Sequence, residues 1–284
     1  MFKNALVGVD GRPSGRDAIT LASRLTDPDG KLTLAHVQPG NVHPLHAITP
    51  GLVAEEREAS GRLLEQERVA ADVQAELVTV EAGTAGSGLH RRAEEHAADL
   101  IVVGSSRRGH IGRAMLGDDT RAALNGAPCA VAIAARGYAE RPLPVAKIGV
   151  AYNGSPESEA ALVTAKGLAA ASRAEVIALE VVSIPTYAFT GLVPPAFGET
   201  VELMLSEANA RMAELEGVRA RAVYGLSGEE LAVFSDQVDL LVVGSRSYGP
   251  VKRLVLGSTS DYLERHARCS LLVLPRQETA AAAV

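Results

Sequence analysis

The chain has 284 residues, which is enough for about two domains of ordinary size, each with its own core. Apolar residues make up 47% of it and charged residues 22%, a composition typical of globular chains and not of disordered ones. The net charge of −6 and the aromatic content of 4% argue against a nucleic-acid partner, because such partners need clustered positive charge and stacking rings. No apolar run approaches the roughly 20 residues of a membrane span, and no signal-peptide pattern is present. We therefore expect a cytoplasmic protein without a membrane partner.

The first half alternates short apolar runs, typical of buried strands, with segments whose apolar residues recur at helical spacing. Strands are predicted at residues 5–9, 32–37, 75–80, 100–103 and 129–134. A first helix is predicted after Pro13 and Ser14, with Ala18, Ile19, Ala22 and Leu25 on one face, and further helices are predicted at about residues 53–71, 89–97 and 119–124. Residues 27–30 (Asp-Pro-Asp-Gly) are interpreted as a turn that ends the first helix, and residues 83–88 as a loop of small residues.

The second half repeats this order of elements. Strands are predicted at residues 148–151, 176–182, 219–223, 240–243 and 270–274. Helices are predicted at residues 157–171, about 201–215, 229–235 and 258–267. Strands that alternate with helices indicate right-handed βαβ units and a parallel sheet. The predicted fold class is α/β, with two tandem domains that each contain a five-stranded parallel sheet with helices on both faces.

Turn-forming residues mark the boundary between the halves, with Pro142 and Pro144 in the joining segment. We predict a first domain at residues 1–138, a linker at 139–144 and a second domain at 145–276. Residues 277–284 end in an alanine run without a visible partner, so a frayed tail is expected there.

An internal repeat is the most informative feature of the chain. Residues 99–117 read DLIVVGSSRRGHIGRAMLG, and residues 239–257, at a constant offset of 140, read DLLVVGSRSYGPVKRLVLG. In both copies a glycine-punctuated loop follows a buried strand and precedes a helix. Small residues let the backbone approach a phosphate group, and the N–H groups at a helix N-terminus bind it. The repeat therefore predicts a phosphate-binding loop in each half.

This arrangement resembles the universal stress protein family in its tandem two-domain form, over about residues 2–276. The family pattern is Gly-x2-Gly-x9-Gly-Ser/Thr after the fourth strand, with an aspartate at the end of the first strand. The second half matches at Gly244, Gly257 and Ser258, but has Ser247 at the second glycine and Asn153 at the aspartate.

The first half departs from the same pattern at other positions. It matches at Gly104 and Gly117 and keeps Asp10, but has Arg107 at the second glycine and Asp118 at the hydroxyl position. Neither half is therefore a complete copy of the pattern.

The resemblance implies an adenine nucleotide α-hydrolase-like fold that binds ATP or AMP, with Mg²⁺ as a possible companion, and that acts in stress or dormancy signalling. It also implies a homodimer or a pseudo-dimeric monomer, in which the fifth strands of the two domains pair across a pseudo-two-fold axis.

The second half is the predicted main nucleotide site. We expect the phosphates on the glycine loop, the ribose near Asn153 and the adenine near the end of the second strand. The predicted binding residues are Asn153, Val181, Val182, Gly244, Ser247, Gly249, Gly257, Ser258 and Thr259. Lys252 and Arg253 add positive charge to this loop.

The first half is predicted to hold a weaker site. Its candidate residues are Asp10, Val37, Gly104, Arg107, Gly117 and Asp118. Asp118 and Asp119 place two carboxylates where phosphates would lie, and each like-charge pair at 4 Å costs about 1 to 4 kcal/mol. Arg107 either fills the space that a glycine would leave open or turns onto the phosphates.

Three functions remain open at this point: a nucleotide-binding regulator without turnover, a slow ATPase, and a nucleotide-free dimerisation or interaction module. No catalytic residue is predicted, because no general base is evident near the phosphate loop. No metal site is predicted, since the seven histidines are scattered. Cys129 and Cys269 are expected to be buried, inert thiols.

Overall fold

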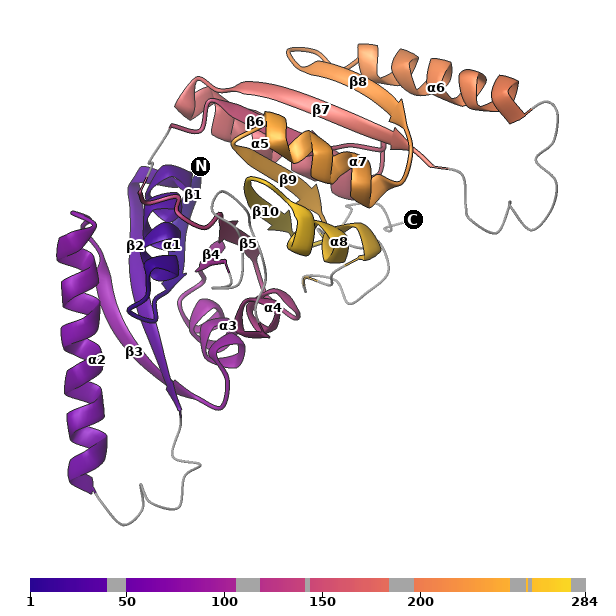
Figure 1. The fold of residues 1–284 in the computed structure, drawn as a ribbon. Helices are drawn as coiled ribbons and strands as arrows, with labels where there is room; N and C mark the ends of the chain where they lie inside the picture. Colours follow the sequence, from indigo (N-terminus) through magenta and orange to yellow (C-terminus); the bar gives the residue numbers. More distant parts are fainter. Residues whose placement is uncertain are drawn as a thin grey trace, which may run out of the picture.

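The computed structural model describes residues 1–39, 50–105, 118–140, 144–183, 197–245, 254 and 257–276. Ten strands form a single sheet in the order β3-β2-β1-β4-β5-β10-β9-β6-β7-β8 (Figure 1). The strands are β1 (Phe2–Gly8), β2 (Thr26–Pro39), β3 (Glu76–Ala82), β4 (Leu100–Gly104), β5 (Ala130–Ala134), β6 (Lys147–Ala151), β7 (Glu175–Val182), β8 (Arg219–Tyr224), β9 (Leu240–Gly244) and β10 (Ser270–Leu274).

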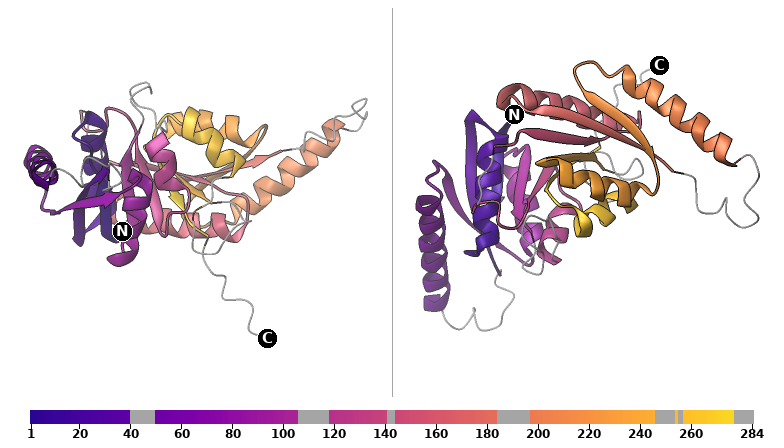
Figure 2. Two further views of the ribbon diagram at one scale, coloured as in Figure 1. Left: turned by 90° about the horizontal axis from the view of Figure 1, so that it is seen from below. Right: turned by 45° about the horizontal axis from the view of Figure 1, so that its top comes forward.

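Helices cover both faces of this sheet, as the fold class predicts. They are α1 (Pro13–Leu25), α2 (Pro50–Ala70), α3 (Ala85–Glu95), α4 (Asp118–Leu124), α5 (Pro156–Ser172), α6 (Phe197–Ala213), α7 (Ser227–Phe234) and α8 (Ser258–His266), with a 3-10 turn at Ser235–Gln237. One core layer joins α1, α2, α5 and α6 to the sheet, and the other joins α3, α4, α7 and α8. Figure 2 shows α2 and α6 at the two ends of the molecule.

The two halves meet at the centre of the sheet, where β5 and β10 pair antiparallel, whereas all other strand pairs are parallel. Leu272 lies opposite Ala132, and these positions differ by the repeat offset of 140. A pseudo-two-fold axis therefore passes beside this residue pair. The pairing covers an edge that each five-stranded half would otherwise expose, and the expected pairing of the fifth strands is confirmed.

The repeated aspartates hold the start of each half's first strand. Asp99 accepts hydrogen bonds from the N–H groups of Lys3 (2.7 Å) and Asn4 (2.9 Å). Asp239 accepts in the same way from Ala146 (2.9 Å) and Lys147 (2.8 Å). This part of the repeat therefore has a structural role.

Two predicted loops are instead parts of regular elements. Residues 27–30, predicted as a turn, belong to β2. The register of β1 and β2 shifts at this point: Phe2 lies opposite Thr26, but Asn4 lies opposite Lys31. This irregular stretch of the strand accommodates the turn-forming residues.

Residues 85–88, predicted as loop, form the first turn of α3. Thr84 caps that helix because its hydroxyl oxygen accepts a hydrogen bond from the Ser87 N–H, and the Ser87 hydroxyl oxygen in turn accepts one from the Thr84 backbone N–H. A serine at the position usually held by glutamate completes this capping box.

Because the sheet is continuous across both halves, the domain limits at residues 1–138 and 145–276 remain a proposal. The predicted linker at 139–144 is described only at residues 139, 140 and 144, and the predicted tail at 277–284 lies outside the described residues. Within the described part of the chain, none of the helices is long and apolar enough to cross a membrane.

Candidate functional site

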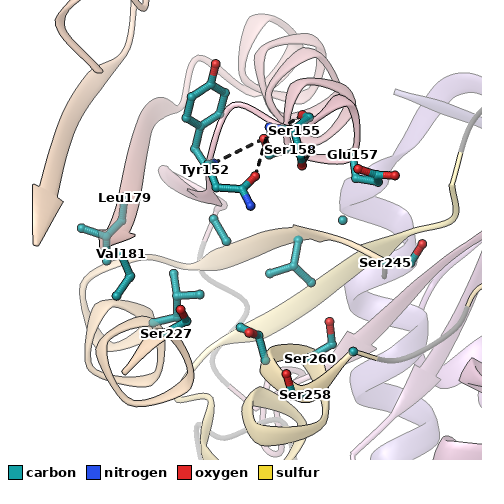
Figure 3. Close-up of a pocket in the computed structure, with 17 residues that line it drawn as sticks. Tyr152, Ser155, Glu157, Ser158, Leu179, Val181, Ser227, Ser245, Ser258 and Ser260 are labelled. Carbon is teal, nitrogen blue, oxygen red and sulfur yellow. Dashed lines mark hydrogen bonds between the residues drawn. The ribbon is translucent and has the colours of Figure 1, made fainter. Parts of the chain in front are cut away.

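A pocket of about 400 Å³ lies at the carboxyl-terminal ends of β6, β7 and β9 (Figure 3). Ligands of open α/β sheets bind at this edge, because the helix N-termini converge there. Seven of its described lining residues are serine or threonine: Ser155, Ser158, Ser227, Ser245, Ser258, Thr259 and Ser260. Its apolar side is formed by Ala151, Leu179, Val181, Leu231 and Val243. The lining thus combines a hydroxyl-rich part with an apolar part.

The N-terminus of α8 supplies part of the hydroxyl-rich side. Gly257 is the N-cap residue, and Ser258, Thr259 and Ser260 form the first turn. No side chain of the described residues caps this end. The first N–H groups of a helix have no partner within the helix and carry a partial positive charge. This end of α8 is therefore suited to an anionic group.

Ser245 provides a second, independent sign of a ligand. The residue is 6% exposed and lines the pocket, and its hydroxyl has no hydrogen-bond partner among the described residues. Its backbone N–H is already bonded to the carbonyl of Leu274 at 2.9 Å. Because a buried, unpaired hydroxyl is unfavourable, a polar ligand group in the pocket would satisfy it.

The turn between β6 and α5 is held by its own side chains, as the dashed lines in Figure 3 show in part. Asn153 accepts a hydrogen bond from the Ser155 N–H (3.1 Å), and the Ser155 hydroxyl accepts one from the Ser158 N–H (3.2 Å). The N-terminus of α5 is thus capped internally. The exposed Asn153 side chain still carries an amide group that suits a ribose hydroxyl.

Glu157 is a pocket residue that the sequence analysis missed. It lies in the first turn of α5, and its side chain is 10% exposed. The Nε atom of Arg276 lies 3.7 Å from its carboxylate. An acidic residue in a first helical turn has an ordinary stabilising role, so the sequence contained no signal that distinguished Glu157.

The repeated glycines at the ends of β4 and β9 have a packing role. A Cβ built on Gly104 would lie 2.1 Å from the carbonyl oxygen of Ser14, at the start of α1. A Cβ built on Gly244 would lie 2.8 Å from the Cβ of Glu157 and 2.9 Å from its carbonyl oxygen. Both glycines are therefore needed for the close approach of a helix to a strand, whether or not a phosphate binds.

The structure brings together six of the nine residues predicted for the main site: Asn153, Val181, Gly244, Gly257, Ser258 and Thr259. Val182 is buried but is not part of the lining, because neighbouring residues of a strand face opposite sides of the sheet. Ser247 and Gly249 lie outside the described residues, as do Lys252 and Arg253.

In the first half, the described candidates are held by local contacts. Asp10 accepts a hydrogen bond from the Arg12 N–H (3.1 Å) and forms an ion pair with its guanidinium group (3.2 Å). Val37 packs in the core on the α3 side, and Asp118 is the first residue of α4. The other two candidates, Arg107 and Gly117, lie outside the described residues.

The cysteines match the expectation of buried thiols. Burial raises the pKa of the Cys129 thiol to about 12 and also raises the pKa of Cys269. Among the described residues, no group of three or more metal-binding side chains occurs.

Comparison with known proteins places this geometry in context. The model of the Universal stress protein family matches residues 1–135 and again residues 144–275. A universal stress protein of Mycobacterium tuberculosis is 32% identical over 186 residues, which are 62% of this chain and 61% of that protein. One from Mycolicibacterium smegmatis is 27% identical over 299 aligned positions, covering 95% of this chain and 96% of the relative.

A solved structure shares the fold over nearly the whole chain. The crystal structure of a universal stress protein from Archaeoglobus fulgidus covers 96% of this chain and 98% of its own, with a TM-score of 0.65 and 16% identity.

Proposed function

The chain belongs to the universal stress protein family, and we propose that it is a cytoplasmic regulatory protein that binds an adenine nucleotide, ATP or AMP, in the pocket of its second half. The proposal includes no catalytic turnover. It includes no nucleic-acid or membrane partner. The β5–β10 pairing makes one chain the counterpart of a dimer of single-domain proteins.

One observation carries the proposal: the N-terminus of α8, which no described side chain caps, and the buried hydroxyl of Ser245, which has no partner in the described part of the chain, line the same pocket. The helix end offers N–H donors with partial positive charge, and the hydroxyl offers a further donor. A phosphate group satisfies both. The apolar side of the pocket, at Leu179 and Val181, suits a planar base.

These features suggest one orientation of the nucleotide. The phosphates would lie against Gly244, Gly257, Ser258 and Thr259, and the ribose near Asn153. The adenine would lie between the end of β7 and α7, near Val181. Should Mg²⁺ accompany the nucleotide, Glu157 is the carboxylate available in the described lining.

The substitution Gly257→Glu tests this assignment. It would place a bulky carboxylate at the N-cap of α8, where it blocks approach to the helix N–H groups and repels phosphate. We expect calorimetry to show that the variant has lost measurable affinity for ATP and AMP.

A matched control introduces the same side chain elsewhere. A Cβ built on Gly198, in the first turn of α6, meets no atom within 4 Å, so Gly198→Glu should fold and bind as the unmodified protein does. Unchanged nucleotide affinity in Gly257→Glu would refute the assignment. A lack of binding by the unmodified protein, even at millimolar ATP or AMP, would favour the nucleotide-free interaction module.

A further inference from the structure

The chain segment that leads into the pocket is held by the first half. Leu254 lies three residues before Gly257, the N-cap residue of α8. Its carbonyl oxygen accepts a hydrogen bond from the Gly126 N–H (2.9 Å), and its own N–H donates one to the Ala127 carbonyl (3.0 Å). Gly126 and Ala127 follow α4, so both bonds cross from one half of the fold to the other. We call this pair of backbone bonds the Leu254 bridge.

The Leu254 bridge lies within a core that both halves share. The Leu254 side chain is fully buried and belongs to a cluster that contains Leu124 and Ala127 of the first half. The same cluster contains Leu263 and Ala267 of the second half. Buried backbone groups need hydrogen-bond partners, and Leu254 finds both of its partners in the first half. The first half therefore helps to set the position of this residue.

A side-chain contact also joins α4 to α8, which lie on the same side of the sheet (Figure 1). The Nη2 group of Arg121 in α4 donates a hydrogen bond to the Glu264 carboxylate in α8, and lies 3.4 Å from the Asp261 carboxylate. Glu264 is 2% exposed. Arg265, on the same helix, lies 3.8 Å from its carboxylate. Within the described part of the chain, Arg121 is thus the cation in hydrogen-bond contact with Glu264.

These contacts act on the part of the pocket assigned to phosphate. The helix α8 presents Ser258 and Thr259 in its first turn and carries Glu264 further along. A helix of nine residues moves as a unit, because hydrogen bonds connect its consecutive turns. A shift of α4 relative to α8 would therefore displace the helix end that the phosphate contacts. Arg121 and Gly126 themselves are not among the described lining residues.

We infer that the first half positions the phosphate-binding end of the second-half pocket, with Arg121 and Gly126 as positioning residues that touch no nucleotide. This inference rests on the proposed function and adds a coupling between the halves. The second half then needs the first for its full affinity, even if the first half binds no nucleotide. Because such a coupling is reciprocal, a nucleotide bound at the end of α8 stabilises the Leu254 bridge in turn.

Calorimetry of AMP and ATP binding to the full chain tests the side-chain contact. Arg121→Gln removes the charge that Glu264 contacts, and should weaken binding in the second-half pocket about fivefold, at the lower end of the range for coupled sites. Arg121→Lys should bind nearly as the unmodified protein does, because a single nitrogen makes both contacts. Arg268→Gln is the matched control. The Arg268 side chain is also 41% exposed and pairs with Asp236 of its own half at 3.0 Å, so its loss should leave affinity unchanged.

A second pair of variants tests the Leu254 bridge. Gly126 has a φ of +87°, which disfavours any residue with a side chain, and a Cβ there would be nearest to His90, at an ordinary 3.8 Å. Gly126→Ala should therefore distort the turn without a clash, and weaken nucleotide binding. Gly217→Ala imposes a similar backbone cost (φ +69°) at an open position after α6, and should leave affinity unchanged. Urea denaturation checks that the two variants lose comparable stability.

Hydrogen exchange gives a readout that a merely structural contact would not change. The Gly126 amide should exchange about fivefold more slowly when AMP or ATP saturates the second-half pocket. The Asp99 amide, which donates to the Asn4 carbonyl within the first half, should exchange at the same rate with and without nucleotide. In Gly257→Glu, nucleotide should no longer slow exchange at Gly126.

The outcomes distinguish this inference from the proposed function. If Arg121→Gln and Gly126→Ala bound AMP and ATP as tightly as the unmodified protein, the inference would be wrong and the proposed function would stand. The same holds if nucleotide left exchange at the Gly126 amide unchanged. An equal loss of affinity in the two control variants would also overturn the inference, because general destabilisation would then explain the effect. Absence of nucleotide binding in every protein, the unmodified one included, would overturn both.

Discussion

Each half of the chain begins a helix beside the glycine that ends a central strand, but the residues at that contact differ. In the first half Ser14 packs on Gly104, whereas in the second Glu157 packs on Gly244. The following serines also differ: the buried Ser245 hydroxyl has no hydrogen-bond partner among the described residues, whereas the Ser105 hydroxyl is not among the buried groups that lack one. The second half therefore carries a carboxylate and an unsatisfied hydroxyl where the first has neither.

This difference separates the residues that hold the duplicated fold from the residues that line the candidate site. The repeated aspartates and glycines have equivalent structural roles in both halves, in strand anchoring and in helix packing. The residues that differ are those that would touch a ligand. Repetition within the sequence therefore identifies the residues that hold the fold more reliably than those that bind.

The largest effect that we expect comes from disrupting the helix-to-strand packing that both halves share. Gly104→Ala should lower the free energy of unfolding by about 3 kcal/mol, because its Cβ meets the Ser14 backbone at 2.1 Å and overpacking costs about 1–3 kcal/mol. Gly244→Ala should cost about half as much, because its nearest contact is 2.8 Å. Urea denaturation followed by circular dichroism measures both.

Each half also contains a helical glycine that serves as a control. A Cβ on Gly61 or Gly167 meets no atom within 4 Å, so alanine at either position should stabilise the protein by about 0.5–1 kcal/mol. If Gly104→Ala proved as mild as these controls, α1 would not pack on β4 as described.

The fold was largely predictable because its signals are local and occur twice. Continuous apolar runs such as residues 100–103 and 240–243 identify buried strands without any knowledge of their partners. The β5–β10 pairing came from the family resemblance, because periodicity alone does not say which edges meet. The strand at residues 27–30 was missed because turn residues occupy an irregular stretch of β2.

The site was predicted in part, for a related reason. The residues that follow the strands were found from the repeat, since the carboxyl ends of parallel strands share one edge of the sheet. Glu157 was missed because its place in the pocket lining depends on the packing of α5 against Gly244, which is a tertiary contact. The state of the Ser245 hydroxyl depends equally on tertiary contacts.

A second prediction would sharpen the comparison by making the first half resemble the family pattern. Replacing Arg107 with Gly and Asp118 with Ser removes a bulky residue from the loop and a carboxylate from the start of α4. We expect the nucleotide stoichiometry to rise from about one to about two per chain, with a gain at the first site of about tenfold, or about 1.4 kcal/mol. Calorimetry or equilibrium dialysis reports the stoichiometry.

The unmodified protein provides the decisive reference for this experiment. Two nucleotides bound with similar affinity before any substitution would show that the carboxylates at Asp118 and Asp119 do not repel phosphate as argued. The double variant should leave the affinity of the second-half pocket unchanged, and this can be checked by combining it with Gly257→Glu.

The smallest effect that we expect concerns a contact present in the first half alone. Asp17 of α1 is 2% exposed and accepts hydrogen bonds from the N–H groups of Gly137 (2.8 Å) and Ala139 (2.8 Å), just after β5. The equivalent position of α5, three residues after Glu157 as Asp17 is three after Ser14, is Ala160. The first half thus uses a buried carboxylate to fix the chain that leads to the second.

Burial raises the pKa of Asp17, and its two hydrogen bonds offset only part of this effect. A carboxyl whose pKa is higher in the folded state contributes stability that is fully present below the unfolded pKa, near 3.9, and is lost as pH rises through the folded value. Asp17→Asn removes this titration and also costs about 1 kcal/mol, because an amide accepts only one of the two bonds well. The stability advantage of the unmodified protein over Asp17→Asn should therefore be larger near pH 3.5 than at pH 7. Thermal unfolding of both proteins between pH 3.5 and pH 7 measures this difference. If the difference in stability stayed constant across this range, Asp17 would not be the group that titrates.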